Sequence, residues 1–148
     1  MIFGRTIAQV AWVVPDIAAA ERFFRDSLGA PPFFKVETAS SIFYLCYAGD
    51  TMLEVIQPVS GPSIYADFLE RHGGGGVHHV AVMVEASEFD AAVADLTGKG
   101  HPVITTQTLP IARVAYLDTS AAIGVATEVI GLTEAGHEWI RKLKNGDY

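Results

Sequence analysis

The chain has 148 residues, the size of one ordinary domain, and half of them are apolar, so it can bury a sizeable core. A net charge of -7 argues against nucleic-acid binding, because no basic stripe is available to neutralise phosphates. No apolar run is long enough for a membrane span, and the single cysteine, Cys46, excludes an internal disulfide and favours the reducing cytoplasm.

The first half of the sequence mixes strands and helices. Asp16 and Ser63 are expected to cap two helices, the first of which ends at Gly29. These helices cover residues 17–28 and 62–72. Strands are predicted for 7–14, 40–47 and 51–58, and the prolines of 30–37 restrict that segment to an edge strand or a loop. A run of four glycines, 73–76, follows the second helix.

The second half repeats this order. Ser87 is expected to cap a helix over 88–100. Strands are predicted for residues 77–84, 101–105, 112–119 and 124–131. An amphipathic helix over 134–144 carries its basic residues near its end, where they complement the helix dipole.

Two landmarks set the register of this repeat. The segment 9–14 (QVAWVV) lies over 79–84 (HVAVMV), an offset of 79 − 9 = 70, and Glu54 lies over Glu128, an offset of 128 − 54 = 74. The period is too long for a solenoid. The sequence therefore predicts one α+β domain, 1–148, made of two tandem βαβββ modules, 5–58 and 77–132, joined by the helix 62–72.

The repeat aligns four polar residues, because it matches Gln9 with His79 and Glu54 with Glu128. Each one stands alone among apolar residues in a strand with a buried pattern, and a buried carboxylate must be paired, protonated or bound to a metal. Imidazole nitrogen with carboxylate and amide oxygens suits one divalent ion such as Zn, Co, Ni, Mn or Fe. Taken singly, each residue also fits a hydrogen-bonded core position or a half-exposed strand.

These features together resemble the vicinal oxygen chelate superfamily over about residues 5–132. The resemblance rests on the paired modules and on the segments QVAWVVPDIAAAERFFRDSLG, SIYADFLERHGGGGVHHVAV and GVATEVIG. The superfamily contains glyoxalase I, methylmalonyl-CoA epimerase, extradiol dioxygenases and bleomycin-resistance proteins. It implies a U-shaped mixed sheet around a metal site with the ligands Gln9, Glu54, His79 and Glu128, a small-molecule substrate and a homodimer.

The resemblance also implies a chemistry. A metal acting as Lewis acid would stabilise an enolate while Glu128 serves as general base, so the chain would be a lyase, isomerase or epimerase acting on a small carbonyl compound or acyl thioester. Glu37 stands roughly where the epimerases carry a catalytic glutamate.

Two other functions stay open. A metal-free binding protein of the bleomycin-resistance type would need an aromatic groove, which could come from Trp12, Phe33, Phe34, Phe43 and Tyr44. A ring-cleaving dioxygenase would need iron and a catechol substrate. Arg113 could bind an anionic substrate group, although a salt bridge is the commoner role for such a residue.

Overall fold

The computed structural model describes residues 6–148, so residue 5 of the predicted first module lies outside the described part. The first half contains β1 (Ile7–Val13), α1 (Ile17–Arg22), the π-helix η1 (Phe23–Ser27), β2 (Phe34–Glu37), β3 (Ser41–Ala48), β4 (Thr51–Pro58) and α2 (Ile64–His72). The second contains β5 (Gly76–Glu85), the 3-10 turn η2 (Ala86–Glu88), α3 (Phe89–Gly98), β6 (Val103–Thr108), β7 (Ala112–Leu117), α4 (Ser120–Ile123), β8 (Ala126–Leu132) and α5 (Glu134–Asn145).

The chain divides into two compact units. The first unit comprises Gln9–His78 and Leu143–Tyr148, and the second comprises His79–Lys142 with the described residues before Gln9. Each unit contains four strands and a packed helix, in the predicted order of strand, helix and three strands. No helix within residues 6–148 is long and apolar enough to cross a membrane.

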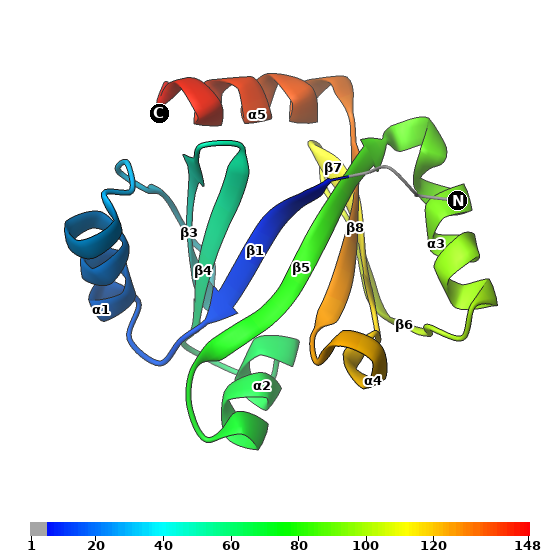
Figure 1. Cartoon of the computed structure of the whole chain (residues 1–148), viewed down its shortest axis with the longest axis horizontal. Coiled ribbons are helices and arrows are strands. Elements are labelled where there is room, and N and C mark those ends of the chain that lie inside the picture. Colours follow the sequence, from blue (N-terminus) through cyan, green and yellow to red (C-terminus); the bar gives the residue numbers. More distant parts are fainter. Residues whose placement is uncertain (1–5) are drawn as a thin grey trace. The chain divides into compact units, whose positions relative to one another are not determined.

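The first unit is a sheet with a helix on each face. Its strand order is β2-β3-β4-β1, with β1 parallel to β4 and the other neighbours antiparallel. On one face α1 packs beside β3 and β4, over Cys46 and Val55 (Figure 1). On the other face α2 contributes Phe68, which packs against Val13 and Ile56. The alternation of β4 side chains puts Val55 and Ile56 on opposite faces, so both faces of this sheet carry apolar packing.

The second unit repeats the strand arrangement, with α3 packed on one face of its sheet. Its strand order is β5-β8-β7-β6, with β5 parallel to β8 and the other neighbours antiparallel. Figure 1 shows α3 beside the strands, and the core beneath it contains Val84, Phe89, Ala115, Leu117 and Val129. The edge strand β6 is exposed along its whole length.

The two units share one pairing register, which fixes the positions of the candidate site residues. In the first unit Gln9 pairs with Met52 and Ala11 with Glu54; in the second His79 pairs with Ala126 and Ala81 with Glu128. The offsets read from the sequence, 70 and 74, reproduce both pairings. The predicted duplication of a βαβββ module is therefore confirmed at the level of individual strand partners.

Side chains cap two helices as predicted. Asp16 Oδ1 accepts from the backbone N–H of Ala19 at 3.0 Å, and Ser63 Oγ accepts from Ala66 at 3.0 Å. Both contacts satisfy a donor that a helix N-terminus otherwise leaves unpaired.

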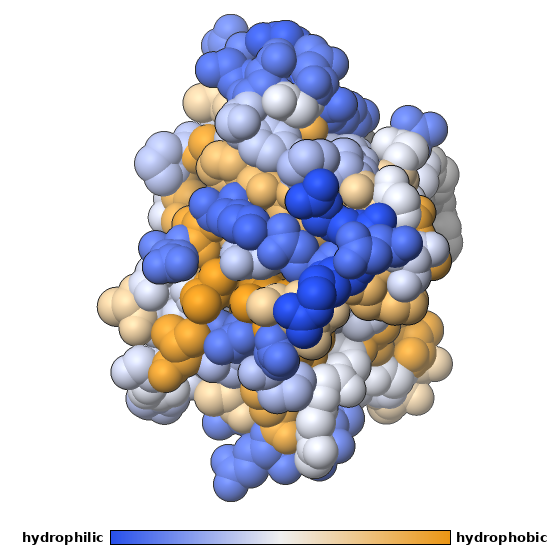
Figure 2. Space-filling view, turned by 90° about the vertical axis from the view of Figure 1, so that its left-hand side faces the viewer, coloured by the Kyte–Doolittle hydropathy of each residue, from blue (hydrophilic) through white to orange (hydrophobic). Residues whose placement is uncertain are grey.

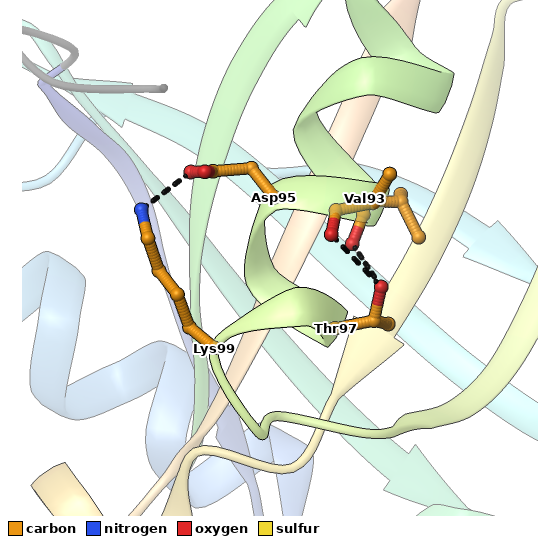
Figure 3. Close-up of polar contacts among 5 residues, drawn as sticks. Val93, Asp95, Thr97 and Lys99 are labelled. Carbon is orange, nitrogen blue, oxygen red and sulfur yellow. Dashed lines mark hydrogen bonds and ion pairs between the residues drawn. The ribbon is translucent and has the colours of Figure 1, made fainter.

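The prediction that Ser87 caps the next helix is wrong. The side chains of Glu85 and Glu88 form a reciprocal capping box across η2, and α3 begins only at Phe89. At the other end of α3, Thr97 Oγ1 donates to the carbonyl of Val93 and Lys99 pairs with Asp95 at 2.8 Å (Figure 3). These local contacts stabilise the C-terminal end of α3, whereas its packing on the sheet is apolar.

The glycine run 73–76 follows α2 and brings the backbone close to the end of β1. Gly73 ends α2 in the left-handed region, with φ of 62°. A Cβ on Gly75 would lie 3.0 Å from the carbonyl oxygen of Val13 and 3.2 Å from Pro15 Cδ. The run is therefore a packed connection, in which at least one glycine is required by a close backbone approach.

Candidate functional site

In the first unit, Gln9 and Glu54 form a polar pair on one face of the sheet. Gln9 is 3% exposed, and its Nε2 donates to Oε2 of Glu54 at 2.5 Å. β1 and β4 are parallel neighbours, and the register places the two residues diagonally across them on the same face. Their strand neighbours on that face, Ala11 and Met52, are buried and apolar. The pair is therefore an isolated polar spot in an apolar surface.

In the second unit, His79 and Glu128 form the equivalent pair. His79 is fully buried and Glu128 is 5% exposed. Nε2 of His79 lies 3.3 Å from Oε2 of Glu128. The surrounding strand residues on this face, Ala81 and Ile130, are again buried and apolar. The imidazole of His79 offsets the cost of burying the Glu128 carboxylate, whereas the Glu54 carboxylate in the first unit is only half-buried and accepts from an amide.

The donor atoms of both pairs fit a divalent cation. Each pair turns a carboxylate oxygen toward a nitrogen-bearing side chain, and carboxylate, imidazole and amide groups are ligands of borderline to hard divalent ions. The Gln9 amide can present its oxygen instead of its nitrogen by a simple flip. Neither unit by itself holds three or more His, Cys, Asp or Glu side chains grouped as a metal site within residues 6–148. Each unit thus supplies half of the predicted ligand set.

Glu37, predicted as a second catalytic residue, is not brought together with Gln9 and Glu54. It is exposed at the end of β2, and the register aligns it with Ile42 and then with Gln57. Gln57 accepts a hydrogen bond from the N-terminus of α1, so this row lies on the α1 face of the sheet. Glu54 and Gln57 lie on the same strand at an odd spacing, and strand side chains alternate between faces. The Glu54 side chain therefore points to the face opposite Glu37.

A cavity of about 570 Å³ also lies in the first unit, on its α1 side. Its lining includes Trp12, Phe23, Leu28 and Leu53, and Trp12 and Leu53 belong to the core cluster under α1. Phe23 and Leu28 are more than half exposed, and Figure 2 shows apolar residues among polar ones on the side of the first unit that carries α1. Trp12 and Leu53 therefore place this cavity on the face opposite Gln9 and Glu54.

The aromatic groove expected for a metal-free binding protein is not assembled from the predicted residues. Trp12 lines the cavity, but Phe33 and Tyr44 pack within the core under α1. Phe43 lies on the opposite face, where it meets the ring of Tyr65 at 5.9 Å. These contacts give most of the set a structural role.

Three further histidines have local partners. His72 stacks on the ring of Phe68 at 4.0 Å, and His78 packs against Tyr65 and Phe68 at 5.3 and 5.2 Å. His137 Nε2 lies 2.9 Å from a carboxylate oxygen of Glu85. His78 thus packs against a helix, as the alternation of strand faces predicts, and His79 remains the candidate ligand.

Arg113 and Cys46 have structural roles. Arg113 forms two hydrogen bonds to Asp90, at 3.1 and 2.8 Å, and these bonds lower the pKa of the Asp90 carboxyl. Cys46 is fully buried, and desolvation raises the pKa of its thiol to about 11, so it is protonated at neutral pH. Cys46 therefore belongs to the apolar core of the first unit.

Tyr116 is a site residue that the sequence reading did not single out. It lies on β7 directly opposite Glu128, and its ring meets that of His79. Extending the repeat to the third strand of each module would have matched Tyr116 with Leu45, which lies opposite Glu54. That alignment was the available signal.

Comparison with known sequences gives a family and several relatives. Residues 8–116 match the family described as the Glyoxalase/Bleomycin resistance protein/Dioxygenase superfamily. The mitochondrial methylmalonyl-CoA epimerase of Bos taurus is 31% identical over 126 residues, covering 81% of this chain and 70% of that protein. An ethylmalonyl-CoA/methylmalonyl-CoA epimerase of Cereibacter sphaeroides is 30% identical over 118 residues, covering 74% and 87%. The Mus musculus epimerase is 37% identical over 93 residues, and the match spans about half (51%) of its length.

Solved structures show the same fold. Methylmalonyl-CoA epimerase from Mycobacterium tuberculosis superposes with a TM-score of 0.71 at 20% identity, covering 90% of this chain and 93% of that one. A Streptomyces coelicolor methylmalonyl-CoA epimerase bound to 2-nitronate-propionyl-CoA gives 0.71 at 22% identity, covering 88% and 96%. The predicted fold class, α+β of the glyoxalase type, is therefore confirmed.

Proposed function

Because the chain belongs to the Glyoxalase/Bleomycin resistance protein/Dioxygenase superfamily, we propose that it is a divalent-metal-dependent enzyme that moves a proton next to the carbonyl of an acyl-CoA thioester. The observation that carries the proposal is the pair of polar spots. Gln9 with Glu54, and His79 with Glu128, occupy the same register positions of two duplicated sheets and are surrounded by apolar residues.

In this proposal the four side chains together hold one divalent ion. A bound ion would act as a Lewis acid that lowers the energy of the enolate formed from the substrate. The residues that would hold it offer one imidazole nitrogen, two carboxylates and one amide oxygen. This set contains no thiolate and suits Zn, Co, Ni, Mn or Fe.

Glu128 is the proposed general base. Its carboxylate takes the proton from the carbon next to the thioester carbonyl, and the electron pair of that C–H bond moves to the carbonyl oxygen to give an enolate. Glu128 stands on one side of this carbon, so the proton that returns to the opposite side comes from a water molecule and gives the epimer. The hydroxide left behind takes the proton held by Glu128, so atoms and electrons balance.

The names of the relatives support this substrate class. The curated relatives that match two thirds or more of their own length are epimerases of methylmalonyl-CoA or ethylmalonyl-CoA. Both compounds carry an acidic C–H bond between a thioester and a carboxylate. No observation on the described residues favours the metal-free binding function or the dioxygenase over this one.

Exchange of the substrate's α-proton with solvent tests the proposal. Protein stripped of metal would be incubated in D2O with methylmalonyl-CoA and with Zn, Co, Ni or Mn, and deuterium incorporation would be followed by NMR. We expect exchange to require metal and to fall by about 100-fold or more in Glu128→Gln. Glu138→Gln, which alters an exposed carboxylate paired with Arg141, is the matched control. Exchange that needs no metal, or that is equal in Glu128→Gln, would overturn the proposal.

A further inference from the structure

Tyr116 contacts the His79–Glu128 pair. Its ring centroid lies 5.0 Å from that of His79, and the two ring planes meet at 86°. On the neighbouring strand it is the direct partner of Glu128. Tyr116 is 8% exposed, so this contact is made inside the protein. Rings that meet edge to face at this separation attract one another through their charge distributions.

The first unit provides an internal comparison for this contact. Leu45 occupies the place of Tyr116, because it is the direct strand partner of Glu54 and is likewise 8% exposed. The leucine accompanies an amide, Gln9, and the tyrosine accompanies an imidazole, His79. An amide can present an oxygen over a wide range of side-chain angles, whereas an imidazole nitrogen has one lone pair in the plane of its ring. The aromatic ring of Tyr116 is therefore present in the unit whose candidate ligand, the His79 imidazole, must keep one ring orientation to bind a metal.

We propose that Tyr116 is a positioning residue that fixes the plane of the His79 imidazole for metal binding. Rotation of the imidazole about its Cβ–Cγ bond would break the perpendicular ring contact with Tyr116 and the approach of Nε2 to Glu128. The aromatic ring of Tyr116, and not its hydroxyl, carries this role, because the contact joins the two rings. The inference rests on the proposed metal-binding function. Neighbours that orient a metal-ligating histidine typically contribute 10- to 100-fold to metal affinity.

Metal titrations of four proteins test this role. Zn and Co dissociation constants would be measured for wild type, Tyr116→Phe, Tyr116→Leu and Val114→Ala, with thermal unfolding of each as the measure of folding. Val114 lies on the same face of β7, opposite Ile130, and controls for a loosened core. We expect Tyr116→Leu to bind about 10- to 100-fold more weakly, and Tyr116→Phe and Val114→Ala to stay near wild type. If Tyr116→Leu does not fold, Tyr116→Met replaces it.

Unchanged affinity in Tyr116→Leu would overturn the inference, and so would an equal loss in Tyr116→Phe, which would assign the effect to the hydroxyl. If wild type itself binds no divalent metal, the proposed function fails. The NMR signals of the His79 ring in metal-free protein then decide the inference alone. A single ring orientation in wild type that becomes mobile in Tyr116→Leu supports it, and identical signals in both proteins overturn it.

Discussion

The first and second units share one backbone pattern but differ at the positions where side chains do chemistry. Gln9 and His79 have equivalent strand partners in the two units, and so do Glu54 and Glu128. The first unit places an amide beside its glutamate and Leu45 opposite it; the second places an imidazole and Tyr116. A duplicated sheet thus holds the geometry constant while the two halves supply different donor atoms.

The way each unit attaches its helix differs as well. On the last strand of the first module, the Gln57 side chain accepts a hydrogen bond from the backbone N–H of Ile17 at 2.8 Å. The repeat offset of 74 matches Gln57 with Gly131, whose missing side chain makes room for the ring of Phe89. At this matched position the first unit adds a polar contact to the apolar packing of α1, and the second unit adds a close contact between Gly131 and Phe89.

The largest expected effect separates the two glutamates. Glu128→Gln should lower the turnover of methylmalonyl-CoA by about 100- to 10,000-fold, because an amide cannot accept the proton. Glu54→Gln should lower turnover much less, since its amide oxygen can still bind a metal. Steady-state kinetics at saturating metal measures both. Equal losses would show that the two halves are chemically equivalent, and would contradict the assignment of the base to Glu128.

Substitution of Gly131 tests the close packing in the second unit. A Cβ at this position would lie 2.8 Å from Cβ of Phe89, so Gly131→Ala should lower the free energy of unfolding by about 1–3 kcal/mol. Urea denaturation measures the change. Gly98→Ala, where nothing lies within 4 Å of the added Cβ, is the control and should not destabilise the protein. If Gly131→Ala unfolds at the same urea concentration as wild type, the close contact between Gly131 and Phe89 does not limit the side chain at this position.

The polar attachment in the first unit should be weaker. Gln57→Ala removes the acceptor for the Ile17 N–H and should cost about 0.5–1.5 kcal/mol of unfolding free energy. Gln57→Glu keeps an acceptor oxygen in place and should recover most of this loss. If Glu and Ala at position 57 are equally destabilising, the hydrogen bond does not hold α1.

Alkaline pH should loosen the first unit selectively. Burial raises the pKa of Cys46 from 9.0 to about 11 and that of Tyr47 from 10.0 to about 12. Each group ionises first in the unfolded chain, so its contribution to stability is complete below pH 9 and is lost as the pH rises toward 11 or 12. Unfolding free energies of wild type and Cys46→Ala between pH 8 and 11 measure this, and the variant should lose less. Parallel curves for the two proteins would rule out the thiol as a cause.

The smallest effect is expected at Glu37. Its carboxylate is exposed on the α1 face of the first sheet, so Glu37→Gln should change turnover by less than about twofold. A large loss in the same kinetic assay would restore the role that the resemblance implied for this residue.

The element order and the polar pairs could be predicted from the sequence because they depend on local patterns repeated twice. The alternation around Gln9 and His79 reports strand faces directly, and the two offsets give the register. Asp16 and Ser63 were recognisable as caps because a cap acts on a residue three positions away.

Features that depend on neighbouring strands could not be predicted in this way. The face of Glu37 follows from the pairing of an edge strand, whose register short polar segments do not specify. Tyr116 lies 12 residues from its partner Glu128, and nothing local to β7 marks it as a site residue. Ser87 was displaced as a cap by Glu85 and Glu88, which together satisfy donors from both sides of η2.

The inclusion of Leu143–Tyr148 in the first unit has a consequence for the order of events during synthesis. Leu143 is 3% exposed, the Tyr148 hydroxyl donates to the carbonyl of Pro32, and the Tyr148 ring meets that of Phe34 at 5.5 Å. These residues leave the ribosome after the whole of the second unit. The unit whose translation begins first therefore cannot complete its packing until the second unit has also been translated.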